Sequence, residues 1–182
     1  MSSVSAKTHF ELFSLPQSYV LDRTELDARY RDMQRFVHPD RYASASDQER
    51  RISMQRAAQV NEAYEVLKDP LKRGRYLLEL HGHAVGDQQG SHQDPAFLMQ
   101  QMELREALAE IRGQQDPLQA LEQLAREIRS QYEALEASLA EAFEAGTDLE
   151  KAVTLVLRMQ FYERLQQEVG ELEAELEDEL YQ

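Results

Sequence analysis

Three consecutive residues, His38, Pro39 and Asp40, combine an imidazole, a rigid proline and a carboxylate. Proline fixes its own φ angle and has no N–H donor, so it ends the helical pattern before it. His38 and Asp40 are then held outward on a loop. A catalytic acid-base pair needs a pocket that excludes water, and the local sequence offers an exposed turn instead. We therefore expect a recognition loop and no enzyme activity, although a plain helix stop with two solvated polar residues stays open.

Helical patterns flank this loop on both sides. Before it, FELFSL predicts a short helix that Pro16 ends, and Asp22 begins a longer helix as its N-cap, with Glu25 completing a capping box. After it, a helix is expected from residue 46 or 47 to 68, and LKRGRYLLEL predicts a short fourth helix. The long segments carry apolar residues at helical spacing: Leu26, Tyr30, Met33, Val37, Ala57, Val60, Ala63, Tyr64 and Leu67. The sequence predicts an antiparallel helical hairpin with a short helix at each end.

Three segments in fixed order resemble the J-domain over about seventy residues: FELFSLP, RYRDMQRFVHPDRY and VNEAYEVLKDPLKRGRY. The resemblance implies docking on an ATP-bound chaperone of the DnaK type, where the J-domain triggers ATP hydrolysis. It also implies which residues dock: His38, Pro39 and Asp40 in the loop, Arg41 beside them, and a basic helix face of Arg29, Arg31 and Arg35. These arginines equally fit a solvated helix face with local pairs such as Asp27 to Arg31.

Charge is spread unevenly along the 182 residues. Residues 1–81 carry 13 Lys and Arg against 12 Asp and Glu, a net of +1, whereas residues 82–182 carry 7 against 22, a net of −15. The composition changes at HGHAVGDQQGSHQD, so we expect a J-domain at 1–80, a linker at 81–94 and a second domain at 95–182. The acidic second half disfavours nucleic acid as a partner.

Composition also bears on cofactors and location. The chain has no cysteine, which excludes disulfides and thiolate sites. His81, His83 and His92 are interpreted as solvated linker residues because no further ligands of suitable spacing accompany them; we expect no metal and no cofactor. The start lacks the pattern of a secretory signal, and no stretch approaches the roughly 20 apolar residues of a membrane span. We expect a cytoplasmic protein without a membrane partner.

Three helical patterns follow the linker. Asp94-Pro95 is an N-cap and first-turn pair that opens a helix to about residue 112, and Asp116-Pro117 repeats the device. Gly146 separates the second helix from a third at about 148–180. The second helix carries a heptad-like seam: Leu118, Leu121, Ala125, Ile128, Tyr132, Leu135 and Leu139. A three-helix bundle is the simplest way to bury these stripes, so the whole chain is predicted to be all-α.

The helix after Asp94 has two apolar stripes. At 100° per residue, the first stripe points in one direction and forms the core face: Phe97, Leu104, Leu108 and Ile111. The second stripe lies about 100–200° away and is bordered by charged residues: Leu98, Met99 and Met102, with Glu103, Arg105, Glu106 and Glu110. This second stripe either packs on another part of the chain or binds a partner, since exposed Leu and Met suit adaptable interfaces.

The segment AFLMQQMELREAL, after LLELHG and before an acidic helical tail, resembles the HscB family, the J-proteins of iron-sulfur cluster assembly. The likeness weakens in the middle helix and returns at RMQFYERL. It implies that the bundle binds an IscU-like scaffold protein, which is handed to the HscA-like DnaK-type chaperone. The matching contact positions are Leu98, Met99, Met102, Glu103, Arg105, Glu106, Glu110 and Phe161.

Two other interpretations keep the same elements. A J-domain protein with a different client would share the hairpin but not the use of the second stripe. A structural helical protein would self-associate through the seam at 118–139 and need no chaperone.

Overall fold

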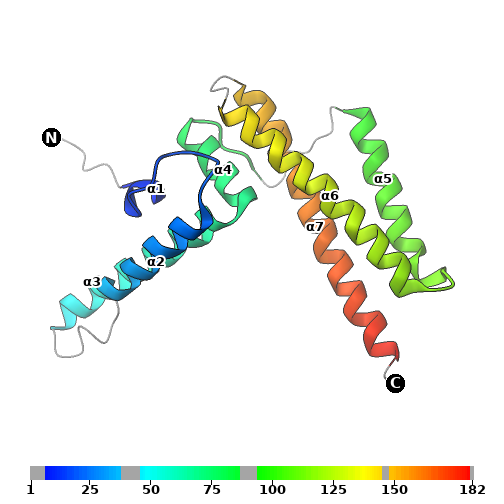
Figure 1. Ribbon diagram of the computed structural model, residues 1–182, viewed down its shortest axis with the longest axis horizontal. Helices are drawn as coiled ribbons and strands as arrows, with labels where there is room; N and C mark the ends of the chain where they lie inside the picture. Colours follow the sequence, from blue (N-terminus) through cyan, green and yellow to red (C-terminus); the bar gives the residue numbers. More distant parts are fainter. Residues whose placement is uncertain (1–6, 38–45, 87–93, 145–147, 181–182) are drawn as a thin grey trace. The chain divides into compact units, whose positions relative to one another are not determined.

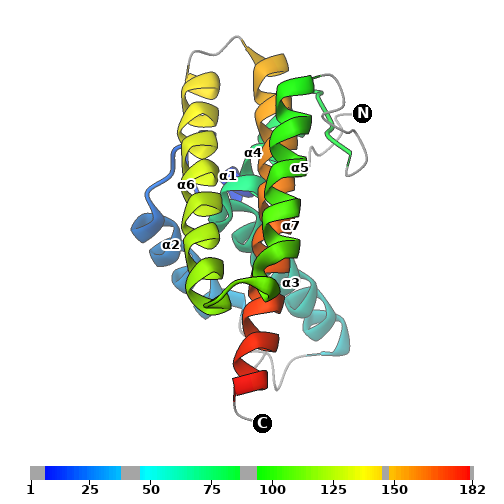
Figure 2. The same cartoon turned by 90° about the vertical axis from the view of Figure 1, so that its right-hand side faces the viewer.

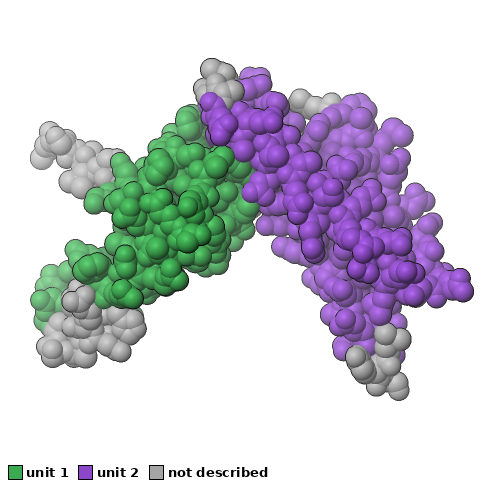
Figure 3. Space-filling view, in the orientation of Figure 1, with its two compact units in different colours: residues 1–81 green, residues 82–182 purple. Residues whose placement is uncertain are grey.

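The computed structural model describes residues 7–37, 46–86, 94–144 and 148–180. The described residues contain helices and no strands, which confirms the all-α prediction. The chain separates into two compact units, residues 1–81 and residues 82–182 (Figure 3). Each unit has its own helices and its own buried core.

Unit 1 is built on a pair of antiparallel helices, α2 (Arg23–Val37) and α3 (Asp47–Lys68), with the short helices α1 (His9–Leu12) and α4 (Pro70–Leu80) against α3 (Figure 1). Apolar side chains from all four helices are buried between them: Phe10, Leu26, Val37, Val60, Ala63, Leu67, Leu71, Leu77 and Leu78. This is the hairpin with flanking short helices that the periodicity predicts.

Side chains at the predicted helix starts satisfy the free backbone N–H groups there. Ser46 and Glu49 form a complete capping box at the start of α3, and Asp69 accepts from the N–H of Lys72 in α4. Asp22 caps α2, with Oδ1 accepting from the N–H groups of Thr24 (2.8 Å) and Glu25 (3.2 Å). The predicted capping box there is only half formed, because the Glu25 carboxylate turns to the Arg29 guanidinium one helical turn on.

Unit 2 contains α5 (Pro95–Glu110), the 3-10 turn η2 (Ile111–Gly113), α6 (Pro117–Glu144) and α7 (Leu149–Leu180). The three long helices run alternately down, up and down beside one another (Figure 2). Their shared core contains the predicted stripe of α5 and much of the seam of α6: Phe97, Leu104, Ile111, Leu121, Leu124, Ile128, Phe161, Tyr162, Leu165, Val169 and Leu176, with Leu108, Leu118, Ala125, Tyr132 and Leu135 packed at its edge. The three-helix bundle is confirmed.

His9 makes the stability of unit 1 depend on pH. Its ring stacks on Tyr76 with centroids 4.2 Å apart. Burial lowers the pKa of His9 below its usual 6.5, against the opposing influence of Glu62 and Glu79. Between the two pKa values, the unfolded chain binds more protons at His9 than the folded chain does. The contribution of His9 to the stability of unit 1 is therefore complete above a pH of about 6.5 and is lost as the pH falls through the pKa of the folded state.

We expect the variant His9→Phe, which keeps an aromatic ring against Tyr76, to flatten the loss of unit 1 stability between about pH 7 and pH 5. Hydrogen exchange at the amides of α1 and α3 measures it at both ends of this range. The difference between parent and variant isolates His9 from the carboxylates, which titrate in both proteins. An identical pH dependence in the two proteins would show that the buried imidazole does not control it.

Candidate functional site: two protein-binding surfaces

The predicted recognition loop lies between α2 and α3 in the sequence. His38, Pro39, Asp40 and Arg41 lie outside the described residues. The helices that carry the loop are described, and they are joined beside it: the buried Ser53 hydroxyl of α3 donates to the carbonyl of Val37 at 3.0 Å. This bond links the last residue of α2 to α3, so both attachment points of the loop belong to one packed hairpin.

The predicted basic face of α2 is exposed to solvent. Arg29 pairs with Glu25 at 3.2 Å and Arg35 pairs with Asp32 at 3.6 Å, both within one helical turn. Exposed pairs of this kind contribute little to stability, so an acidic partner can displace them at low cost.

The expected pair of Asp27 with Arg31 does not form. Asp27 instead accepts from Arg23 (2.8 Å) and from the Tyr64 hydroxyl of α3 (2.9 Å), while Arg31 stays exposed. At 100° per residue, Arg31 and Arg35 lie about 40° apart around α2, whereas Arg29 lies about 160° from Arg31. The two arginines nearer the loop therefore share one face, and Arg29 belongs to another.

The second apolar stripe of α5 faces away from the bundle core. Met99 is 63% exposed and Met102 is 70% exposed, while Leu98 is partly buried at the border. The predicted charged border is also exposed: Glu103, Arg105, Glu106 and Glu110. In contrast, Phe97 and Leu104 of the same helix are buried. The two predicted faces of α5, one buried and one pointing away from the core, are therefore confirmed. The second stripe is exposed rather than packed on unit 2.

Phe161 does not share this exposure. Phe161 is only 9% exposed to solvent, and its ring packs edge-on against that of Phe97 with centroids 5.7 Å apart. Above it lies the guanidinium of Arg105, 5.9 Å from the ring centre and 4.0 Å from the Glu168 carboxylate. Phe161 therefore belongs to the core beneath α5, where it supports Arg105 and Phe97.

Ion pairs attach both ends of α5 to α7, and sequence reasoning missed them. At the start, Arg158 of α7 pairs with the N-cap residue Asp94 and covers the face of Phe97 at 5.0 Å from the ring centre. Asp94 at the same time accepts from the N–H groups of Ala96 and Phe97. After the other end, Arg112 pairs with Glu175 and Glu179. Arg105 and Arg112 are seven residues apart, and so are their partners Glu168 and Glu175. This matching spacing was the available signal for the contact of Arg112.

We expect Arg158→Met to loosen the first turn of α5, because Asp94 loses its charged partner and Phe97 its cation-π contact. The cost should be about 1 kcal/mol, discounted for partial exposure of the pair. Hydrogen exchange at the amides of Ala96 and Phe97 should accelerate. The matched control Arg126→Met removes an exposed pair with Glu122 on α6 and should change neither quantity. Equal exchange in the two variants would mean that Arg158 does not hold α5.

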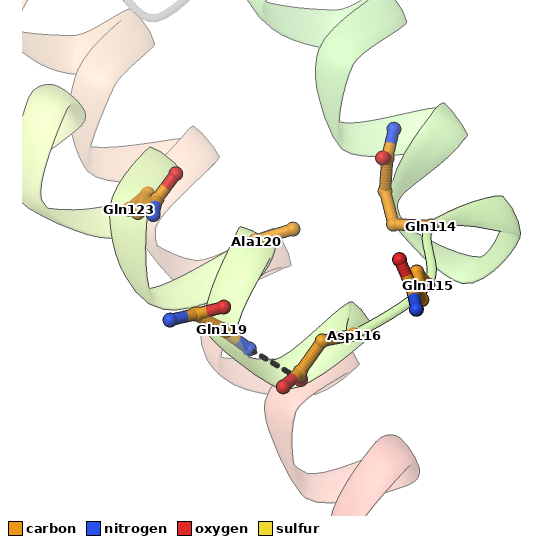
Figure 4. A pocket seen from close by; sticks show the side chains of 6 residues that line it. All are labelled: Gln114, Gln115, Asp116, Gln119, Ala120 and Gln123. Atoms are coloured by element: carbon orange, nitrogen blue, oxygen red, sulfur yellow. Dashed lines mark hydrogen bonds between the residues drawn. The ribbon is translucent and has the colours of Figure 1, made fainter.

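A polar hollow lies elsewhere on unit 2, at the start of α6. Its lining comes from the turn before α6 and the first two turns of that helix (Figure 4): Gln114, Gln115, Asp116, Gln119, Ala120 and Gln123. The Asp116 carboxylate caps α6 by accepting from the N–H of Gln119 at 3.1 Å. The other side chains of this lining are four glutamines and an alanine.

His81 and His83 of the expected linker are described, and both are exposed. His81 ends α4, and its Nδ1 lies 2.7 Å from the carbonyl oxygen of Leu77. No group of three or more His, Asp or Glu side chains is placed to hold a metal ion in the described part of the chain. Likewise, none of the described helices is long and apolar enough to cross a membrane.

Comparison with known proteins matches both units. The family model for the DnaJ domain matches residues 8–76, and the one for the HSCB C-terminal oligomerisation domain matches residues 93–170. A protein of Burkholderia mallei named co-chaperone protein HscB homolog is 45% identical over 163 residues, which are 90% of this chain and 92% of that protein.

Solved structures agree with this match. Chaperone HscB from Vibrio cholerae has a TM-score of 0.84 at 37% identity and covers 93% of this chain and 99% of its own. Human co-chaperone protein HscB has a TM-score of 0.85 at 28% identity, and the match covers 93% of this chain and 84% of the human one. A DnaJ-type helical hairpin followed by a matched helical bundle defines a J-domain co-chaperone. More narrowly, the chain belongs to the HscB family.

Proposed function

We propose that this protein stimulates the ATPase of an HscA-like chaperone of the DnaK type and delivers to it an IscU-like scaffold on which iron-sulfur clusters are assembled. It would act in the cytoplasm, supporting maturation of iron-sulfur proteins. No bond is made or broken in the chain itself. Membership of the HscB family and the presence of a DnaJ domain support this proposal.

The observation that supports scaffold binding is the exposed apolar stripe on the outer face of α5. Met99 and Met102 present flexible apolar side chains that the bundle leaves uncovered. Glu103, Glu106 and Glu110 continue around the same helix. Apolar contacts would supply affinity, and the carboxylates would select a partner that is basic around an apolar patch. Leu98 and Arg105 would complete the rim of this site.

In this proposal, binding to the chaperone depends on the loop between α2 and α3 and on the arginines near it. His38, Pro39 and Asp40 would enter the chaperone, while Arg31, Arg35 and Arg41 would lie against an acidic surface, with Arg29 at its margin. Because these contacts are between exposed charges, they would mainly accelerate encounter and fix orientation, and salt should weaken them.

The two units would work as an adaptor. Binding the scaffold through unit 2 raises the local concentration of the client near the chaperone that unit 1 engages. Hydrolysis is then triggered when the client is within reach of the chaperone.

The test is the steady-state ATPase rate of two chaperones, the HscA-like one and a general DnaK. Each is measured with this protein alone, with the scaffold alone and with both together. The proposal expects the largest stimulation from the HscA-like chaperone with both added. Equal stimulation of both chaperones, unaffected by the scaffold, would instead assign the chain to another client.

A further inference from the structure

We propose that Met99 and Met102 form an oxidation-sensitive pair, whose conversion to methionine sulfoxide by hydrogen peroxide weakens binding of the client at α5. This inference rests on the proposed function, because it concerns the regulation of the same surface. It adds a chemical modification site to that surface.

Accessibility is the first requirement, and the two thioethers meet it. Met99 and Met102 are 63% and 70% exposed and lie three residues apart on the outside of α5. Residues at this spacing are neighbours on a helix. Hydrogen peroxide is uncharged, so the surrounding carboxylates do not repel it. Met159, in contrast, has no exposed surface and should be protected.

The second requirement is that no thiol in the chain reacts with the oxidant before these thioethers do. The chain contains six methionines and no cysteine, so thiols do not compete within it. Among the described methionines, Met54 on α3 is the one with comparable exposure, at 64%. It belongs to unit 1, outside the stripe, and therefore serves as an internal comparator of equal accessibility.

The chemistry is a two-electron oxygen transfer. The thioether sulfur attacks one peroxide oxygen, the O–O bond breaks, an S–O bond forms, and the second oxygen leaves as water after proton transfer. Sulfur is oxidised and peroxide is reduced. The product is a polar sulfoxide, which is reversible by methionine sulfoxide reductases.

The consequence follows from the position of the pair. Methionine serves adaptable interfaces because its side chain is flexible and apolar. Burying a sulfoxide against an apolar partner leaves a polar group without a hydrogen bond, so affinity should fall roughly tenfold or more. Neither thioether supports the bundle core, so the fold should survive the modification.

The experiment treats the full-length protein with hydrogen peroxide, maps oxidation by peptide mass spectrometry and titrates the IscU-like scaffold by calorimetry before and after treatment. The matched variant, Met99→Leu with Met102→Leu, keeps apolar side chains but has no sulfur in the stripe. A third sample, Met54→Leu, removes the comparator. Oxidised parent is also incubated with the two stereospecific methionine sulfoxide reductases.

We expect the parent and Met54→Leu to lose scaffold affinity roughly tenfold on oxidation, and the reductases to restore it. The double leucine variant should keep the affinity it had before treatment. Unchanged affinity of a parent whose Met99 and Met102 are fully oxidised would overturn the inference, and so would equal loss in the double variant. Failure of the untreated parent to bind the scaffold is a separate result, which would overturn the proposed function and with it this inference.

Discussion

His38→Gln should abolish the stimulation of the HscA-like chaperone's ATPase and return the rate to that of the chaperone with scaffold alone. In the proposed mechanism the imidazole makes a direct contact with the chaperone, and the adjacent Pro39 restricts the backbone beside it. Glutamine keeps a polar side chain of similar length but has no ring. The loss should therefore come from the missing contact and not from unfolding. Steady-state ATP hydrolysis measures it.

The control for this variant is His83→Gln, the same change at an exposed histidine between α4 and α5. It should stimulate hydrolysis like the parent. His38→Gln should also bind the scaffold with the parent's affinity, since the client site is on α5. Stimulation that survives in His38→Gln would remove the loop from the mechanism, and a joint loss of scaffold binding would indicate a general folding defect.

Leu98→Ala combined with Met102→Ala should lower scaffold affinity about 100-fold, from two truncations that each cost about 1–2 kcal/mol at the centre of an interface. The thermal stability of the protein should change little, because Met102 is mostly exposed and Leu98 is only partly buried. Calorimetric titration with the scaffold and thermal unfolding measure the two quantities.

A matched control replaces the same residue types in unit 1, Leu80→Ala with Met54→Ala, both exposed. It should leave scaffold binding unchanged. Sedimentation at several concentrations shows whether either pair of substitutions alters self-association. A parallel loss of stability and binding in the α5 variant would mean that the stripe is part of the packing of the bundle, and its role as a binding site would be wrong.

Helix positions could be read from the sequence because local signals decide them. Asp22 and Asp94 cap α2 and α5 where predicted, and Ser46 caps α3, which was expected to begin at residue 46 or 47. These interactions span two or three residues, so the local sequence is enough to locate them. The faces of α5 followed from its periodicity for the same reason.

Contacts between helices were less predictable. Asp27 satisfies its carboxylate with Tyr64 from α3 as well as with Arg23, so the local pair with Arg31 does not form. Phe161 looks like a contact residue by resemblance, yet its ring packs with Phe97 of α5. In both cases the neighbour comes from another helix, and the pattern within one helix does not specify it.

The candidate client site shows the same division. Angle and residue type placed the second stripe of α5 away from its core face, but they left open whether that stripe packs on another part of the chain. The attachment of that helix through Arg158 could not be predicted, because the ion pair with Asp94 joins residues 64 positions apart. An arginine in the middle of α7 gives no local sign of its partner.

In the proposed mechanism one chain binds both the chaperone and the scaffold, and a mixing experiment tests this most directly. The HscA-like chaperone and limiting scaffold receive either the parent or an equimolar mixture of His38→Gln with the Leu98→Ala, Met102→Ala variant. The mixture contains every functional surface, but never an intact loop and an intact stripe in the same molecule. We predict that the parent gives the additional scaffold-dependent stimulation and the mixture does not. A mixture as active as the parent would contradict the adaptor mechanism.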